Sequence, residues 1–481
     1  MNSLSSNPAS SLTIRQTIGL FALALMPRLL LLFLGPWQHP GRGFQPDSYR
    51  YLLLAEALRR HHSFGLPEPE GLMHQSVAKL RAENGTLPPA DADGLRPESF
   101  RTPGYPLFIA GIESFRGDVS AVLALQCFVG GAMACLAAFI GQSLSLSARS
   151  AFLVGLFWAL HPGLIVFDAV LLTESLFNGF VVIALFLVCR WRSPLSLIGA
   201  GVLLGLATLV RPLGLLYVPG ALAVAWPRLP SKFLGMMILV VAAGLPPALW
   251  AFRNQTVGEG FRLTSVGDLN LLYYTTAYSI SEERGEDWLQ SWPIRAQELT
   301  DRLSGQLQPG EDVVTAARRL ALDEIRSRPK TVARVQAKSW LKLLFDHSLP
   351  TLAGTLGLSY QPSGLFSTLL SGDDGNQPRQ QGSSLALRIA ALSWMVLNAL
   401  IALAAFAEIV QAIRKHQWRI LIFGGLSILL FTLATGSVGL ERFRMPMMLP
   451  LFVLAANSLS SVTAGKTELS AAQPSPGERS K

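Results

Sequence analysis

The chain is divided by apolar segments of about 18 to 25 residues, the length that a helix needs to cross the hydrocarbon core of a bilayer. Of its 481 residues, 50% are hydrophobic and only 15% are charged, whereas soluble domains usually carry about a quarter of charged residues. The pattern predicts an α-helical polytopic membrane protein. We place apolar spans near residues 14–35, 119–144, 149–167, 173–190, 195–216, 217–227, 231–251, 386–413, 418–436 and 445–462.

Lysine and arginine residues in the short links predict the orientation. When the short segment 217–227 is counted as a span, the basic links all fall on one side of the membrane, as the positive-inside rule requires. Both termini are then cytoplasmic, and the long segments 36–118 and 252–385 lie outside. We therefore attribute the formal net charge of +9 to basic residues that set the orientation in the membrane. The sequence has no basic stripe with interleaved aromatic residues, so it does not suggest a nucleic-acid partner. The basic residues of the links are Arg149, Arg190, Arg192, Arg228, Lys232, Arg414, Lys415 and Arg419.

Both long segments are polar and have helical character. The stretch EDVVTAARRLALDEIRSRP opens with acidic residues and is amphipathic. It is followed by KTVARVQAKSWLKLLFDH, a basic amphipathic helix of the kind that lies along a membrane surface. The predicted parts of the chain are a cytoplasmic N-terminus (1–13), a transmembrane module (14–251) that includes the first outer loop (36–118), a second outer helical loop (252–385), C-terminal transmembrane helices (386–462) and a disordered cytoplasmic tail (463–481).

The cysteines and histidines do not indicate a metal site. Cys127, Cys135 and Cys189 lie in apolar runs without metal-type spacing, so we interpret them as small hydrophobic residues. His161 and His347 have no second ligand at a recognisable spacing. The chain also has no Gly-x4-Gly-Lys phosphate loop and no dinucleotide fingerprint. The sequence therefore predicts no bound metal and no nucleotide.

Several arginines depart from the positive-inside pattern. Arg28 and Arg211 lie inside apolar runs, toward their outer ends, where a charge usually faces a polar cavity or a partner. Guanidinium groups match phosphate oxygens in bidentate geometry, so arginines converging on one face suggest an anionic ligand. The alternative for Arg28 and Arg211 is that they extend to lipid headgroups. The arginines that map to the outer face are Arg101, Arg253, Arg442 and Arg444.

Three carboxylates map to the same face. Asp47 follows Pro46 at the start of an amphipathic helix, whereas Asp168 and Glu174 flank the turn between the third and fourth spans. A carboxylate beside an acceptor hydroxyl or amine can take its proton during nucleophilic attack. The alternatives are that Asp47 caps the helix and that Glu174 offsets a helix dipole.

A series of short motifs at outer membrane boundaries resembles a known family. The motifs are, in order, PDSYRYLLLAEAL, FRTPGYPLFIAGI, LLTESLF, GLATLVRPLGLL, ALWAFRNQTVGEGFRLTSVGDLNLLYY and GLERFRMPMMLPLF. Their order is similar to that in the GT-C glycosyltransferases of the protein O-mannosyltransferase and lipid A aminoarabinose transferase type. The resemblance runs from about residue 14 to residue 460. It implies a GT-C-like bundle of about ten or more transmembrane helices with two extracytoplasmic helical loops.

The resemblance also implies roles for individual residues. Asp47 matches the first-loop aspartate of the family and would be the catalytic base, and Glu174 matches the acidic residue of a Thr-Glu-Pro-like turn and is the second catalytic candidate. The chain departs from the protein mannosyltransferases at Ser48, where they carry glutamate, and this difference weakens the case for a protein acceptor. The residues that would bind the donor phosphate are Arg101, Arg211, Arg253, Arg442 and Arg444.

The implied activity is transfer of a sugar, with inversion, from a polyprenyl-phosphate donor to a lipid, glycan or protein acceptor. It would take place at the extracytoplasmic face of a bacterial plasma membrane. No cofactor is required, and a divalent cation held by Asp47 and Glu174 is kept as an alternative. The competing hypotheses are a transporter or flippase of a lipid-linked anion, whose path the same arginines would line, and a noncatalytic subunit of an envelope-assembly complex.

Overall fold

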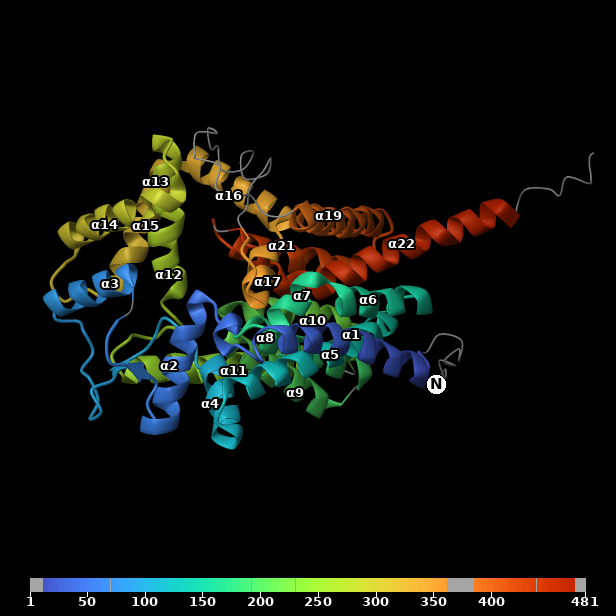
Figure 1. Ribbon diagram of the computed structural model, residues 1–481, viewed down its shortest axis with the longest axis horizontal. Helices are drawn as coiled ribbons and strands as arrows, with labels where there is room; N and C mark the ends of the chain where they lie inside the picture. The colour runs from blue at the N-terminus through green and yellow to red at the C-terminus, as the bar shows by residue number, and fades with distance from the viewer. Residues whose placement is uncertain are drawn as a thin grey trace, which may run out of the picture.

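The computed structural model describes residues 12–360 and 385–471, apart from residues 70, 145, 192, 230 and 438. A bundle of long apolar helices carries a layer of shorter, more polar helices at one end (Figure 1). Within the described ranges, the β-structure is one two-stranded ladder. The predicted α-helical polytopic architecture is confirmed. Residues 1–11 of the predicted N-terminus, residues 361–384 of the second loop and residues 472–481 of the predicted tail lie outside the described residues. The tail was predicted to be disordered from residue 463, but the last apolar helix continues to Ala471.

The bundle is formed by the two ends of the described chain. Its N-terminal helices are α1 (Ile14–Leu34), α4 (Gly104–Arg116), α5 (Val119–Ser143), α6 (Ala148–Leu160), α7 (Pro162–Asp168), α8 (Glu174–Arg190), α9 (Pro194–Val210), η3 (Pro212–Tyr217), α10 (Val218–Ala225), η4 (Trp226–Arg228) and α11 (Lys232–Thr256). Its C-terminal helices are α19 (Leu385–Arg414), α20 (Trp418–Ile420), η6 (Leu421–Leu426), α21 (Ser427–Ala434), η7 (Glu441–Phe443), η8 (Met445–Met447) and α22 (Met448–Ala471).

The bundle helices begin and end close to the predicted spans, and the exceptions have local causes. The span predicted at 149–167 is two helices, α6 and α7, bent by 52° where Pro162 begins the second, because proline cannot continue the hydrogen-bond pattern of the preceding helix. The span predicted at 195–216 stops at Val210. Pro212 disfavours a helical backbone at Arg211, which is extended.

Fewer helices than predicted are long enough to cross a membrane on their own. Among the described residues, α1, α5, α11 and α19 meet this test by length and composition, and the bent pair α6–α7 raises the number to five. The apolar helices Pro194–Val210, Pro212–Ala225 and Trp418–Ala434 are shorter. Breaks at prolines and π-helical turns thus account for part of the difference from the predicted ten spans.

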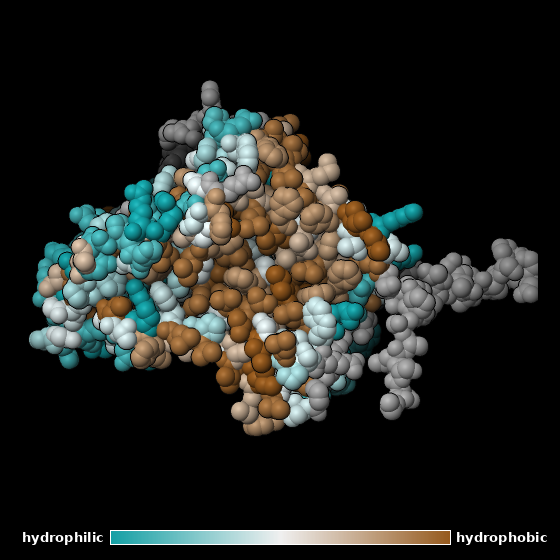
Figure 2. Space-filling model, turned by 90° about the horizontal axis from the view of Figure 1, so that it is seen from below, coloured by the Kyte–Doolittle hydropathy of each residue, from teal (hydrophilic) through white to brown (hydrophobic). Residues whose placement is uncertain are grey.

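Apolar side chains point outward from the bundle. Val241 and Leu249 on α11 are each 62% exposed, and Leu403 and Phe406 on α19 are similarly exposed. Figure 2 shows the same feature over a wider surface: a hydrophobic region covers the bundle, and hydrophilic residues gather at the end that carries the polar helices. A continuous apolar exterior of this kind suits contact with lipid rather than water.

The outer layer combines helices from both long loops. The first loop contributes η2 (Pro40–Gly43), α2 (Pro46–His61) and α3 (Leu72–Glu83), and the second contributes α12 (Val266–Asn270), η5 (Leu271–Thr276), α13 (Ala277–Arg284), α14 (Trp288–Gln306), α15 (Val313–Ser327), α16 (Pro329–Phe345) and α17 (Leu349–Leu356). Side chains of α3, α14 and α15 share a separate hydrophobic core that includes Leu80, Leu299 and Val313.

The two amphipathic helices predicted in the second loop are present. Asp312 caps α15 by accepting a hydrogen bond from the Thr315 backbone N–H, as its acidic start suggested. The basic helix α16 connects the outer layer with the C-terminal helices, because Lys338 pairs with Glu282 and Trp340 donates to the Thr432 carbonyl. Contact of α16 with lipid stays a prediction.

A short β-ladder closes the first loop. Strands β1 (Gly65–Leu66) and β2 (Arg96–Pro97) pair antiparallel, with Gly65 opposite Pro97. A Cβ at Gly65 would lie 2.5 Å from the Arg96 carbonyl oxygen, so only glycine permits this approach. The pairing returns the chain to α2, and Arg101 therefore lies against residues at the start of that helix.

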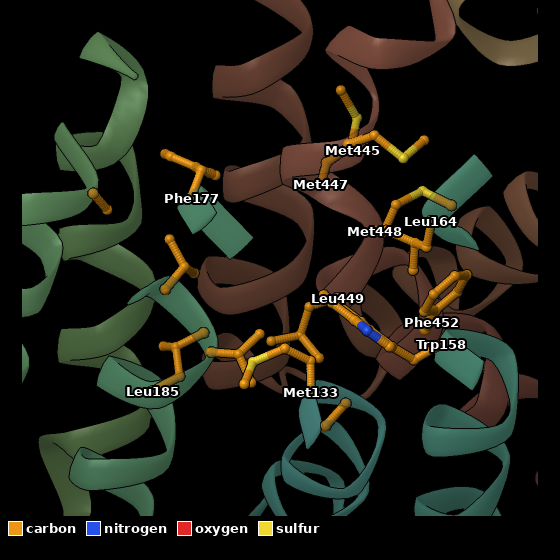
Figure 3. Close-up of a cluster of buried hydrophobic side chains, with 14 of the residues drawn as sticks. Met133, Trp158, Leu164, Phe177, Leu185, Met445, Met447, Met448, Leu449 and Phe452 are labelled. Atoms are coloured by element: carbon orange, nitrogen blue, oxygen red, sulfur yellow. The ribbon is translucent and has the colours of Figure 1, made fainter. Parts of the chain in front are cut away.

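The C-terminal segment is anchored by a methionine-rich core. Met445, Met447 and Met448 lie with Phe177, Trp158 and other buried side chains of the N-terminal helices (Figure 3). The ring centroids of Trp158 and Phe452 are 6.3 Å apart. This packing fixes the position of the backbone just after Arg442. The Arg442 side chain extends from there toward α2 and α8.

Candidate active site

Asp47 lies in the first turn of α2, but it does not cap the helix. The helix follows Gln45, whose backbone N–H donates to the Ser48 hydroxyl, and Pro46 occupies the first helical position. The alternative that Asp47 caps the helix is therefore not supported, because the N-cap is Gln45 and Asp47 is the second residue of the helix. Ser48 is fully buried and donates to the Leu171 carbonyl oxygen. This bond ties the start of α2 to the turn before α8.

The carboxylate of Asp47 instead bridges two arginines. Its Oδ1 atom is 2.6 Å from Nη2 of Arg101, and its Oδ2 atom is 2.9 Å from Nη1 of Arg442. Arg101 follows the β-ladder, and Arg442 comes from η7, near the other end of the chain. Two guanidinium groups from distant parts of the sequence thus converge on the carboxylate predicted to be catalytic.

Glu174 extends the same network. Its Oε1 atom lies 3.1 Å from Nε of Arg442 and 2.7 Å from Nη1 of Arg211. Glu174 begins α8 and is 1% exposed, while Arg211 occupies the extended break between α9 and η3. The structure therefore links the predicted site residues in the order Arg101, Asp47, Arg442, Glu174 and Arg211. These five residues are called the charged cluster below.

The charged cluster contains three guanidinium groups and two carboxylates, so one positive charge is not balanced within it. Two of its buried nitrogen atoms, Nε of Arg101 and Nη1 of Arg211, have no hydrogen-bond partner among the described residues. Nη1 of Arg211 is close to Glu174 but lacks the alignment of a hydrogen bond, so the contact is an ion pair only. Unused donors and excess positive charge suit an anionic ligand.

The arginines also determine the protonation of Asp47. Burial raises the pKa of this carboxyl group, but the adjacent Arg101 and Arg442 outweigh burial and lower the pKa to about 2. For Arg442, burial lowers the pKa, and Glu174 and Asp47 reverse that effect and raise it above the ordinary value. Asp47 is therefore a firmly ionised carboxylate in this arrangement. It becomes more basic only if an arginine moves away or is neutralised by another anion.

Aromatic residues surround the charged cluster on the side of α2. The Arg101 guanidinium lies 5.2 Å from the ring centroid of Tyr51, and its Nη1 atom is 3.4 Å from the Tyr51 hydroxyl. Tyr51 packs edge-to-face against Tyr105, which donates to Gln126. These residues were not predicted as part of the site. Tyr51 follows Asp47 by four residues, so helical spacing could have placed it on the same face.

Two of the predicted phosphate-binding arginines make contacts elsewhere. Arg253 donates to the carbonyl oxygens of Phe64 and Glu98, and its guanidinium lies 4.8 Å from the ring centroid of Trp250. Arg444 is buried and pairs with Glu441 at 2.7 Å. Among the described residues, no ion pair joins either arginine to the charged cluster. A role of Arg253 or Arg444 in phosphate binding stays a prediction that these contacts do not favour.

Arg28 and Asp168 form a separate ion pair inside the bundle. Nε of Arg28 is 2.7 Å from Oδ2 of Asp168, and the other guanidinium nitrogens donate to the carbonyl oxygens of Ala24, Trp158 and Ala159. Arg28 thus neither reaches lipid headgroups nor lines an open site. The alternative base Asp168 is occupied by this arginine.

A buried polar cluster around Glu441 was not predicted from the sequence. Glu441 accepts hydrogen bonds from Trp394, Ser348 and Arg444. Nearby, Nε2 of His161 lies 3.1 Å from Oδ1 of Asn398, and the Asn398 amide nitrogen donates to the Asp346 carbonyl oxygen. These bonds join α16, α19 and η7 to the start of α7. Polar residues within apolar helices, such as Asn398 and His161, were the available sequence signal.

The side chains of Asp47 and Glu174 do not fit a divalent cation in this arrangement, because Arg442 contacts both carboxylates. In the part of the chain that the structure describes, no group of three His, Cys, Asp or Glu residues could hold a metal ion. We therefore derive no step from a metal. Whether the protein needs a cofactor stays a matter for experiment.

Two solved structures are similar to this chain over most of its length. The crystal structure of ArnT from Cupriavidus metallidurans bound to undecaprenyl phosphate is 14% identical, with 97% of this chain and 82% of that chain covered and a TM-score of 0.35. The same protein in the apo state is 15% identical, with 96% and 80% covered and a TM-score of 0.35. No protein-family model and no curated protein matches the sequence.

Proposed function

We propose that the protein is a glycosyltransferase that moves a sugar from a polyprenyl-phosphate donor to an acceptor, with inversion at the anomeric carbon. The observation that carries this proposal is the charged cluster, in which two carboxylates and three arginines alternate. The guanidinium groups are held by carboxylates. A phosphate offers the same planar groups a competing set of anionic oxygens.

The phosphate is proposed to bind Arg101, Arg211 and Arg442. When an acceptor hydroxyl or amine attacks the anomeric carbon, a new bond forms there and the bond from that carbon to the phosphate oxygen breaks. The bonding electrons leave with the phosphate, where charge increases. Arginines placed before the reaction can stabilise this charge. Nε of Arg101 has no hydrogen-bond partner among the described residues and is one donor for that contact.

Asp47 is proposed to accept the proton of the attacking group. Its low pKa depends on Arg101 and Arg442, so transfer of these arginines to the donor phosphate would make the carboxylate more basic when it is needed. Glu174 contacts Arg211 and Arg442 and is almost completely buried. We assign it a positioning role: it holds the two arginines at the distance of one phosphate.

The donor lipid would enter between helices of the bundle. A mainly apolar cavity of about 230 Å³ is lined by Trp340, Ile401 and Met448, among other residues, and by Arg444. Arg444 is two residues from Arg442, so the cavity lies beside the segment that carries the phosphate-binding arginine. We propose that it holds the first part of the polyprenyl chain while the phosphate reaches the charged cluster.

The direct test is transfer by the purified protein in detergent. A set of radiolabelled polyprenyl-phosphate sugars is incubated with lipid, glycan and protein acceptors, and the expected result is release of polyprenyl phosphate together with a labelled product. Movement of an unmodified lipid-linked anion across proteoliposomes, without transfer, would favour the transporter. If the protein shows no transfer and no movement of the lipid-linked anion, the noncatalytic-subunit hypothesis is favoured.

The location of the site is tested separately. We propose that the charged cluster faces the outside of a bacterial plasma membrane, because the short links at the other end are basic. The native cysteines are buried, so a single introduced cysteine can be labelled selectively. A cysteine at the exposed position Gln290 should react in intact cells, and one at Lys415 only after permeabilisation. Reversed labelling would contradict the proposed orientation.

A further inference from the structure

A polar hollow of about 100 Å³ lies in the outer layer, next to the charged cluster. All of its lining residues come from the two outer loops, within residues 50–100 and 259–314. It therefore opens to the water side of the molecule rather than to the lipid. By the volume that one buried water needs, roughly 10 to 15 Å³ on this measure, the hollow has room for several waters or for one monosaccharide ring in their place.

The hollow shares a wall with the charged cluster. Arg50 lines the hollow and follows Asp47 by one turn of α2. Phe100 also lines it, and the Arg101 guanidinium lies 5.0 Å from the Phe100 ring centroid on the way to Asp47. The side chains of Phe100 and Arg101 thus lie between the hollow and the predicted base.

Two buried ion pairs line the hollow. Nε of Arg50 is 3.0 Å from Oε2 of Glu98. Arg81 binds Glu259 through two parallel contacts of 2.7 and 2.9 Å. Arg81 is 9% exposed, and its Nε atom has no partner among the described residues. The hollow is therefore lined by largely buried polar groups that are paired with one another, and Nε of Arg81 is one donor without a partner among them.

The balance of these groups determines which ligand they suit. The lining contains Arg50, Arg81 and Arg96 but also Glu68, Glu98 and Glu259, so neither an anion nor a cation is favoured. Guanidinium groups only donate hydrogen bonds and carboxylates only accept them, whereas a hydroxyl does both. A neutral molecule with several hydroxyl groups can satisfy both kinds of side chain.

The remaining lining fits the same ligand. Several prolines provide apolar faces that the C–H groups of a sugar ring can cover, whereas Phe100 is buried beneath His74 and Arg101. The His74 ring packs edge-to-face on Phe100 at 4.4 Å. Burial lowers the pKa of His74 to about 3, helped by Arg50 and Arg101, so the imidazole is neutral and offers one donor and one acceptor.

We propose that this hollow binds a sugar unit of the acceptor and presents the neighbouring hydroxyl or amine to Asp47. The inference rests on the proposed function and narrows the acceptor to a glycan or a glycolipid with an exposed sugar. The donor sugar is a less suitable occupant, because it is attached to the phosphate at the charged cluster, and the hollow is reached from the outer loops.

The test uses binding of simple sugars to the full-length protein in detergent. The probes are the methyl glycosides of glucose, mannose and N-acetylglucosamine, followed by saturation-transfer NMR. Ala78→Phe fills the hollow, because Ala78 lines it, and Ala82→Phe is the matched control at an exposed position of the same helix. At least one glycoside should bind the wild type and the Ala82→Phe variant with equal affinity. Ala78→Phe should lower the affinity for that glycoside more than tenfold.

A second variant guards against loss of folding. His74→Ala removes a polar group without adding volume. It should lower the affinity for the same glycoside several-fold and leave the melting temperature unchanged. Undecaprenyl phosphate should bind all variants as it binds the wild type, because the charged cluster is intact. The proposal is overturned if no glycoside binds the wild type or if Ala78→Phe binds as well as Ala82→Phe. Sugar binding without use of any polyprenyl-phosphate donor would instead refute the proposed function and leave the sugar site standing.

Discussion

The pair Arg28–Asp168 and the charged cluster contain the same kinds of residue but use them differently. Arg28 is completely buried, and each of its guanidinium nitrogens has a partner in Asp168 or a backbone carbonyl. In the charged cluster, 28% of the Asp47 side chain is exposed, and Nε of Arg101 has no hydrogen-bond partner among the described residues. A saturated pair can only stabilise the bundle, whereas an accessible, incompletely paired cluster can still receive a ligand.

The largest expected effect concerns the two aspartates. Asp47→Asn should lower turnover by roughly 10²- to 10⁴-fold, because an amide cannot take a proton. It should also reduce stability, since Arg101 and Arg442 lose their anionic partner. Asp168→Asn, the matched control, should reduce stability while leaving turnover per folded molecule unchanged. Turnover and melting temperature are measured together. An active Asp47→Asn variant would move the search for the base to Glu174.

Removal of Arg28 should have the next largest effect, on stability. Arg28→Met leaves the buried Asp168 without its partner and should cost roughly 3–5 kcal/mol of unfolding free energy. The double variant Arg28→Met/Asp168→Asn should recover part of the loss, because no buried charge is then unpaired. Unfolding by denaturing detergent measures both. A single variant as stable as the wild type would show that the pair is dispensable.

Acid should weaken the charged cluster in a defined range. The pKa of Asp47 is lowered from 3.8 to about 2 in the folded protein. The stability that this ionised carboxylate contributes is therefore complete above about pH 4 and is lost as the pH falls toward 2. The shift corresponds to about 2 kcal/mol. Melting temperatures between these pH values should fall less in Asp47→Asn than in the wild type. Equal falls would mean that Asp47 is not held by the arginines in solution.

The smallest effects should come from substitutions that keep the charge. Arg211→Lys and Arg442→Lys remove the fork of donors that matches a phosphate, and each should weaken donor binding about tenfold, or about 1.4 kcal/mol. Arg253→Lys is the comparison, because Arg253 contacts backbone carbonyls outside the cluster. Its donor affinity should stay near the wild-type value. Equal losses in all three variants would restore Arg253 to the phosphate site.

Most of the candidate residues selected from the sequence lie together in the structure, but their individual partners were not predicted. Asp47, Arg101, Glu174, Arg211 and Arg442 were each selected from motif and outer position, and they are in contact in the structure. Arg444 was selected for the same reason but turns toward Glu441. Position relative to the ends of the apolar segments is readable from the sequence, whereas the direction in which a side chain points from its helix is not. Arg442 and Arg444 are only two residues apart, yet they face different clusters.

Local chemistry was readable where neighbouring residues decide it. Apolar segment length and the acidic start of α15 were read correctly from the sequence. The prolines at residues 162 and 212 interrupt spans that were predicted as continuous, although their effect is equally local. A bilayer requires such segments because an unpaired backbone group in hydrocarbon is costly. Only the tertiary structure decided which charges meet: Arg442 binds Asp47 across 395 positions of the chain. That contact depends on how helices rotate and pack, and this is set by many weak interactions between residues far apart in the sequence.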